Sequence, residues 1–240
     1  MSKITVLTCT AAISSIILIF NALMSLSIQA QPQLFPNPII TTPLVSTRGH
    51  FNLETGELLS SSHSHNSYGI SNVAGFNQTS CPTNGIALYV HGVCAGQSEA
   101  REQLDRIKLS LNANGFNSPV VGYTWDSNTA PNPSGWVVSK FIANQNGPKL
   151  AKFISDYKDS CSDVPIRVIA HSLGARIVES TLMNLNNSQT WIESGRKIDS
   201  IHLMGAAISD KATSRNTPFG AAINNVVTEF ITYSIPKTTT

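Results

Sequence analysis

Apolar residues change their spacing several times between residues 85 and 233. Short runs of consecutive apolar and β-branched residues, typical of strands covered on both faces, alternate with stretches of helical spacing. The runs predict strands at residues 86–90, 119–123, 166–169, 198–204 and 226–233. The stretches between them predict helices at residues 98–114, 136–157 and 173–185. This alternation indicates an α/β fold with a mostly parallel sheet and helices on both faces.

The turn at residues 170–174 joins a predicted strand to a predicted helix and carries a serine. A serine on a sharp strand-to-helix turn needs small residues two positions before and after it, because larger side chains would collide. Ala170 and Gly174 meet that need around Ser172. The pattern predicts a nucleophile elbow, a turn that lifts the serine hydroxyl above the sheet at the positive end of a helix. The alternative is a serine in an ordinary strand–helix connection.

A second turn, His91-Gly92-Val93, follows the predicted strand at residues 86–90. When a serine attacks an acyl carbonyl, negative charge develops on the oxygen, and two backbone N–H groups must already point there. Leu173, directly after the serine, supplies one of these groups. The loop after the earlier strand supplies the other, and Val93 is the candidate. The alternative is a plain glycine turn at the end of a strand.

Four short motifs are similar to those of the α/β-hydrolase superfamily, and within it to those of the esterase/lipase-like proteins. They are Val90-His91-Gly92, Tyr123-Thr124-Trp125-Asp126-Ser127, Ala170-His171-Ser172-Leu173-Gly174 and Leu203-Met204-Gly205-Ala206-Ala207. The resemblance covers about residues 85–235. It implies an α/β-hydrolase fold and a serine hydrolase that acts on small-molecule or lipid esters without a cofactor. It also implies Ser172 as the nucleophile and Val93 and Leu173 as the oxyanion donors.

The C-terminal part of the chain departs from the family's pattern. In the family, an acid and then a histidine follow the nucleophile along the chain. Residues 235–240 contain neither, and His202 falls inside a predicted strand. Asp210 is an alternative acid, because some members of the family carry the acid after the strand that precedes it. We therefore expect the fold to lack its final strand and helix.

Two classes of function stay open at this point. The first is an exported serine hydrolase of the esterase/lipase type, whose general base the sequence does not identify. The second is a catalytically impaired or truncated hydrolase-fold protein that acts as a binding module. The distinction matters because a serine hydroxyl without a base to take its proton is a poor nucleophile.

The cysteines allow one pairing to be predicted within the family's fold. Cys81 precedes the strand at residues 86–90, and Cys161 precedes the strand at residues 166–169. In that fold the two parallel strands are neighbours, so their amino ends lie side by side, and an exported domain is oxidised. We expect a disulfide between Cys81 and Cys161, and we expect Cys94 to stay unpaired near the active site.

The first 84 residues divide into a targeting segment and a connecting region. Residues 1–30 contain a single charge, Lys3, and residues 4–28 are largely apolar. They predict a cleaved signal peptide, with a retained membrane anchor as the alternative, so the protein is expected to be secreted or anchored on the extracellular side. Residues 31–84 predict a proline-rich linker and a short β region with a hairpin at residues 50–59. Residues 85–240 form the predicted core.

Composition excludes some classes of function. Hydrophobic residues make up 41% of the 240 positions, charged residues make up only 12%, and the formal net charge is +2. The chain has no basic block, so nucleic-acid binding has no support. His50, His63 and His65 lie in a Ser/Asn-rich stretch without neighbouring carboxylates or cysteines, which favours solvated loop histidines over a metal site.

Overall fold

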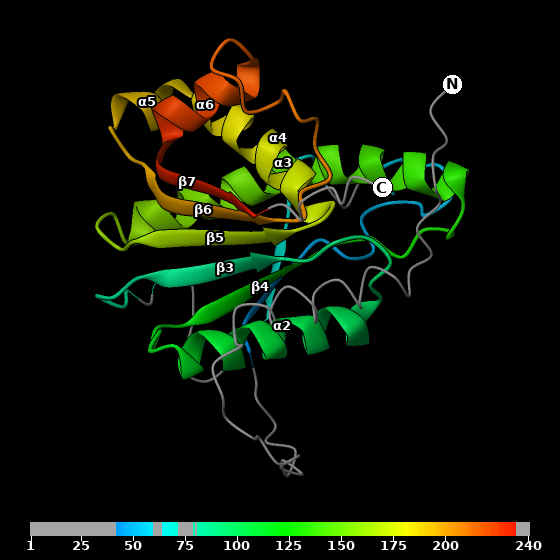
Figure 1. Cartoon of the computed structure of the whole chain (residues 1–240), viewed down its shortest axis with the longest axis horizontal. Coiled ribbons are helices and arrows are strands. Elements are labelled where there is room, and N and C mark those ends of the chain that lie inside the picture. Colours follow the sequence, from blue (N-terminus) through cyan, green and yellow to red (C-terminus); the bar gives the residue numbers. More distant parts are fainter. Residues whose placement is uncertain (1–41, 60–63, 72–78, 80, 234–240) are drawn as a thin grey trace, which may run out of the picture.

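The computed structural model describes residues 42–59, 64–71, 79 and 81–233 (Figure 1). Its elements in chain order are β1 (Leu44–Ser46), β2 (Gly69–Ser71), β3 (Ile86–Val90), α2 (Gln97–Ala113), β4 (Val120–Thr124), α3 (Pro133–Ser160), β5 (Ile166–His171), α4 (Gly174–Asn186), α5 (Gln189–Glu193), β6 (Ile198–Met204), α6 (Pro218–Val226) and β7 (Val227–Tyr233). The predicted bounds of β3 and β6 are confirmed, and β4, β5 and β7 lie close to theirs.

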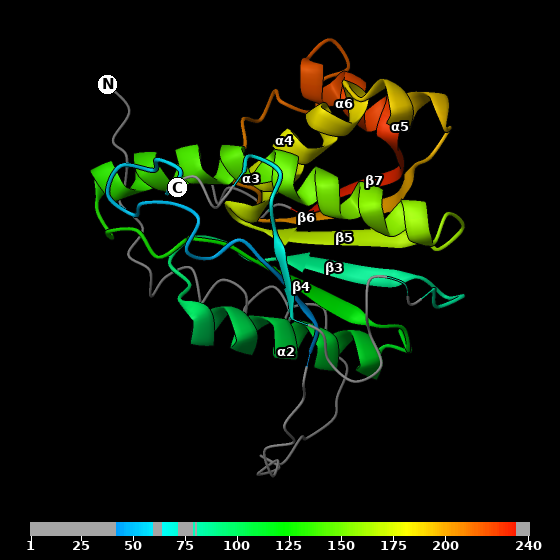
Figure 2. The same cartoon turned by 180° about the vertical axis from the view of Figure 1, so that it is seen from behind.

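The strands form one seven-stranded sheet in the order β2-β1-β4-β3-β5-β6-β7. Every neighbouring pair is parallel except β1 and β2. Helix α2 covers one face of the sheet, and α3, α4, α5 and α6 lie on the other (Figure 1, Figure 2). The predicted α/β fold with a mostly parallel sheet is therefore confirmed. The parallel strands end at a common edge, which is where ligands bind in folds of this type.

The region predicted as a linker and short β region contributes directly to the sheet. Strand β1 pairs with β4, with Leu44 opposite Gly122 and Ser46 opposite Thr124. The hairpin predicted beyond it is confirmed, because Phe51 and Leu58 form an antiparallel bridge. Strand β1 thereby carries the residues after it to the carboxyl end of β4.

Helix α3 packs closely on α4 at Gly147 and fixes the helix that follows the turn at Ser172. A Cβ atom at position 147 would lie 2.1 Å from the Ser180 hydroxyl oxygen, so only glycine allows this approach. Pro148 has no N–H, so the Asn144 carbonyl one turn earlier lacks its helical donor. The Ser180 hydroxyl donates to that carbonyl over 2.8 Å instead. The contact gives this carbonyl a donor and joins the two helices.

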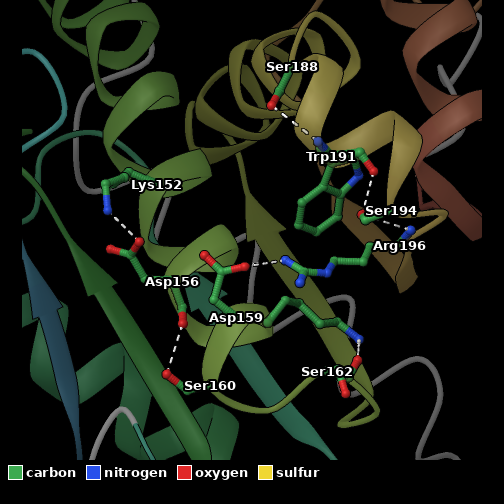
Figure 3. A network of polar contacts seen from close by, with 10 residues as sticks. Lys152, Asp156, Asp159, Ser160, Ser162, Ser188, Trp191, Ser194 and Arg196 are labelled. Carbon is green, nitrogen blue, oxygen red and sulfur yellow. Dashed lines mark hydrogen bonds and ion pairs between the residues drawn. The ribbon is translucent and has the colours of Figure 1, made fainter.

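Polar contacts at the amino ends of the strands join the last turns of α3 to the segment around α5 (Figure 3). Asp159 near the end of α3 pairs with Arg196, which precedes β6. The Ser188 hydroxyl caps α5 by accepting a hydrogen bond from the Trp191 N–H over 3.3 Å. Trp191 itself is buried in the core. These contacts stabilise the edge of the sheet that the amino ends of its strands form.

The predicted disulfide between Cys81 and Cys161 is confirmed, with their Cα atoms 5.4 Å apart. It closes a loop with a sequence separation of 80 residues. A bridge of this kind stabilises a domain by about 2–4 kcal/mol, chiefly by restricting the unfolded chain. The expectation for Cys94 is wrong, because Cys94 is also disulfide-bonded.

Several predictions fall on residues outside the described part of the chain. The signal or anchor segment at residues 1–30, including the apolar stretch 4–28, and His63 belong to this group. Among the residues that the structure does describe, no helix has the length and apolar character needed to span a bilayer.

Candidate active site

Ser172 occupies the sharp turn between β5 and α4 that the sequence predicts. Its φ angle is +50°, in the left-handed region that a residue with a side chain rarely adopts. Three backbone hydrogen bonds engage it: the Ser172 N–H donates to the Met204 carbonyl over 3.0 Å, and the Ser172 carbonyl accepts from the N–H groups of Ala207 over 3.0 Å and Ala175 over 3.1 Å. The end of β6 and the segment after it therefore help to enforce the strained conformation of the serine.

Gly174 allows the start of α4 to approach the end of β3. A Cβ atom at position 174 would lie 2.5 Å from the Val90 carbonyl oxygen and 2.8 Å from the His91 carbonyl oxygen. Both atoms belong to the backbone, so neither can move aside as a flexible side chain does. On the other side of the serine, Ala170 is fully buried. The requirement for small residues on both sides of Ser172 has a direct steric cause at Gly174.

The loop after β3 packs against the turn at Ser172. A Cβ atom at Gly92 would lie 3.0 Å from the Ser172 Cβ, so glycine brings this backbone close to the serine. Val93 and Leu173 flank this contact in the sequence. Within the described part of the chain, no hydrogen bond uses the N–H group of either residue. The two predicted oxyanion donors are thus free to bind a ligand oxygen.

His91 lies beside the serine in the fold, but both of its ring nitrogens are engaged elsewhere. Its Nδ1 donates to the Gly92 carbonyl over 2.8 Å. Its Nε2 accepts from the Trp125 N–H over 3.3 Å, and the ring stacks on the Trp125 ring. Burial lowers the pKa of His91 from 6.5 to about 3. The imidazole is a neutral group whose two nitrogens bond to residues other than Ser172.

The other two histidines near this edge are also not bonded to the serine. The buried Nδ1 of His171 lies against Gly92 and has no hydrogen-bond partner, and burial lowers the pKa of His171 to about 4. His202 lies inside β6, bonds through Nε2 to the Ser200 hydroxyl over 3.0 Å and stacks on Tyr233. Among the described residues, the Ser172 hydroxyl itself makes no hydrogen bond.

The alternative acid, Asp210, is exposed on the loop after β6. No hydrogen bond or ion pair within the described ranges engages its carboxylate. The structure therefore brings Ser172, Val93 and Leu173 together but does not join Asp210 to a histidine. The other carboxylate near this edge, Asp126, is buried and accepts hydrogen bonds from the backbone N–H groups of Gly49 and Phe51, each over 2.9 Å.

Comparison with known proteins assigns the chain to a family. A family model described as "Alpha/beta hydrolase of unknown function (DUF900)" matches residues 71–226. The chain belongs to this family. Two solved structures of an acetyl xylan esterase, one of them an iodinated complex, align with 65% of this chain and 85% of theirs at 13% identity and a TM-score of 0.40. No curated protein matches the sequence.

The family assignment confirms the α/β-hydrolase part of the resemblance, while the esterase/lipase-like part stays a prediction.

The sequence did not single out Arg48, which the fold brings to the loop after β3 in this α/β-hydrolase. Arg48 donates hydrogen bonds to the carbonyls of Ala95 and Gly96. Its only signal in the sequence is its position as the first charged residue after Lys3.

Metal ligands do not gather at this edge. Within the described ranges, no group of three or more His, Cys, Asp or Glu side chains is arranged to hold a metal ion. The expectation of a solvated loop histidine is wrong for His50, which is buried beside Phe51. It is confirmed for His65, which is exposed.

The buried His91 gives the stability of this α/β-hydrolase a specific dependence on pH. In the unfolded chain His91 takes up a proton near pH 6.5, whereas in the folded state it stays neutral down to about pH 3. Between these values the unfolded state binds more protons, so stability falls as the pH falls, by about 1.4 kcal/mol per pH unit for one histidine. Urea denaturation at several pH values should show a slope smaller by about this amount in His91→Asn. Equal slopes in the wild type and in His91→Asn would contradict the assignment.

Proposed function

We propose that this α/β-hydrolase is an exported serine hydrolase that acts on carboxylic esters through Ser172. The observation that carries the proposal is the strained Ser172 backbone beside two unused N–H donors, those of Val93 and Leu173. Backbone strain of this kind costs about 1–3 kcal/mol and persists where the surrounding structure enforces it, typically at active sites. The motifs that resemble those of esterase/lipase-like proteins support the same substrate class.

The proposed chemistry is acyl transfer to the serine. The Ser172 hydroxyl oxygen bonds to the acyl carbon while its proton passes to a water molecule, which later protonates the leaving alkoxide, and the carbonyl oxygen gains negative charge between the two N–H groups. Each such donor lowers the barrier by about 3–4 kcal/mol, because it is already oriented before the charge develops. Collapse of the tetrahedral intermediate expels the alcohol and leaves an acyl serine, which water hydrolyses to the free acid.

Export is part of the proposal, as a secreted protein or as one anchored on the extracellular side of a membrane. The apolar segment at residues 4–28, with one preceding charge, is the pattern that supports it. The Cys81–Cys161 disulfide agrees with an oxidising compartment, because disulfides are rare in reducing ones.

A second candidate function is supported by the histidines. His91 and His202 are hydrogen-bonded to other groups, and no described histidine is bonded to the Ser172 hydroxyl. A site with oxyanion donors and no base binds acyl groups but turns them over slowly. In this candidate the protein is an impaired hydrolase that acts as a binding module for esters.

Labelling with a fluorophosphonate probe tests the nucleophile in both candidates. Phosphonylation uses the same serine oxygen and the same oxyanion donors as ester attack. We expect mass spectrometry of the labelled protein to find the adduct on Ser172 and the adduct to be absent from Ser172→Ala. Ser162→Ala, which changes an exposed serine at the opposite edge of the sheet, is the matched control and should label like the wild type. A folded wild-type protein that gains no adduct on Ser172 would rule out the proposed function.

A further inference from the structure

Arg48 lies outside the predicted core, yet its side chain reaches the loop that carries Val93. The residue follows β1, which pairs with β4, and β4 in turn pairs with β3. The sheet therefore places Arg48 near the carboxyl end of β3, with β4 between the two. Asp126 fixes the backbone that follows Arg48 by accepting hydrogen bonds from the N–H groups of Gly49 and Phe51. The guanidinium is therefore presented from an anchored main chain.

Within the described residues, the hydrogen bonds of the Arg48 side chain are made with the loop after β3 and the end of β4. Nη2 donates to the Ala95 carbonyl over 2.9 Å and to the Gly96 carbonyl over 3.0 Å, and it lies 3.3 Å from His91 Nε2. Nε donates to the Thr124 hydroxyl over 2.6 Å. The planar fork of a guanidinium can make these contacts together, which the point charge of a lysine cannot do.

The loop that Arg48 holds contains a second strained residue. Cys94 has a φ of +62°, and a residue with a side chain stays in that region only when neighbouring contacts enforce it. The Cys94 N–H donates to the Ser127 carbonyl over 2.8 Å, and the Ala95 N–H donates to the Ser127 hydroxyl over 3.3 Å. Arg48 engages the next two carbonyls, those of Ala95 and Gly96. Bonds to Ser127 and Arg48 thus fix the loop immediately after Val93, whose N–H remains unused.

We propose that Arg48 is a positioning residue for this loop, and that it keeps the Val93 N–H aligned with the substrate oxygen above Ser172. The inference rests on the proposed function and adds to it a residue that touches neither the serine nor the substrate. Arg48 acts through the carbonyls of Ala95 and Gly96. Its loss leaves these carbonyls without the guanidinium donor, so the loop shifts and one of the two oxyanion donors moves out of place.

The rate of Ser172 phosphonylation measures this effect directly. In Arg48→Ala, the maximal rate of labelling should fall by about 10²-fold, the usual cost of losing one oxyanion donor, while the probe concentration for half-maximal rate changes little. Millimolar guanidinium should restore much of the rate by binding in the space left by the side chain. Arg48→Lys should remain slow, because an ammonium cannot replace the fork. Arg101→Ala, at an exposed position on α2, should label like the wild type.

A merely structural role gives a different result. It would lower labelling only in proportion to the loss of folded protein, measured by denaturation of the same samples, and added guanidinium would not restore the rate. Either that result or an unchanged rate in folded Arg48→Ala would overturn the inference. If Arg48→Ala does not fold, the decision passes to Arg48→Lys, for which a wild-type rate would overturn it. Failure of the wild-type protein to label Ser172 is separate, because it removes the proposed function itself.

Discussion

The Gly174→Val variant is expected to lose its folded state. A Cβ atom at this position would lie within 2.8 Å of two backbone carbonyl oxygens, those of Val90 and His91. Relief requires α4 to move away from β3, but α4 is also fixed against α3 at Gly147 and Ser180. Overpacking that cannot be relieved, together with a branched side chain beside a strained turn, costs more than about 4 kcal/mol, a large part of the roughly 5–15 kcal/mol by which a typical domain is stable.

Chemical denaturation followed by circular dichroism measures this loss. Gly69→Val is the matched control, because a Cβ at Gly69 would have only an ordinary contact, 3.7 Å from the Ser46 carbonyl oxygen. The control should stay within about 1 kcal/mol of the wild type, since Gly69 is exposed on an edge strand. A Gly174→Val protein with wild-type stability would show that the approach of α4 to β3 is not tight.

The sheet and its main helices were predictable because their patterns are local and repeated. The run of apolar residues in β3 predicts a buried strand, and both β3 and β6 have their predicted bounds. The Ser172 turn was predictable for a related reason. The turn requires small residues two positions before and after Ser172, at Ala170 and Gly174, so the requirement is visible in the local sequence.

The elements that sequence reasoning missed lack such a trace or have a weak one. Strand β1 is only three residues long, and its pairing partner β4 lies far along the chain, so no periodicity could place it in the sheet. Helix α6 did have a start signal, a Thr217 cap followed by Pro218. Its interior contains a glycine and two asparagines, which are poor helix formers, so the sequence pattern does not predict this helix.

The missed part of the candidate site follows from the same limits. Arg48 meets Ala95, Gly96 and Thr124 only because β1 enters the sheet beside β4. Cys94 was expected to be unpaired because its sequence position beside the site was the only guide, whereas a disulfide depends on tertiary contact. A residue whose contacts depend on the tertiary fold therefore cannot be identified from its neighbours in the sequence.

Turnover of p-nitrophenyl butyrate by the protein is expected to be only slightly above background, although the nucleophile and oxyanion donors are present. A serine with oxyanion stabilisation and binding but no base retains about 10³–10⁴-fold acceleration over water, which is about a million-fold below a complete triad. His91 is held by Gly92 and Trp125, and His202 is held by Ser200, so neither accepts the Ser172 proton in this arrangement.

The steady-state rate of the wild type, compared with that of Ser172→Ala, decides the point. A small rate that falls further in Ser172→Ala supports a serine that reacts without an efficient base, because the oxyanion donors then act alone. An ordinary esterase rate that Ser172→Ala abolishes would contradict the prediction. It would mean that His171, His202 or a histidine of another chain reaches Ser172 and accepts its proton. Repeating the assay with His171→Ala and His202→Ala would then identify the base, since only its removal would reduce the rate as far as loss of the serine does.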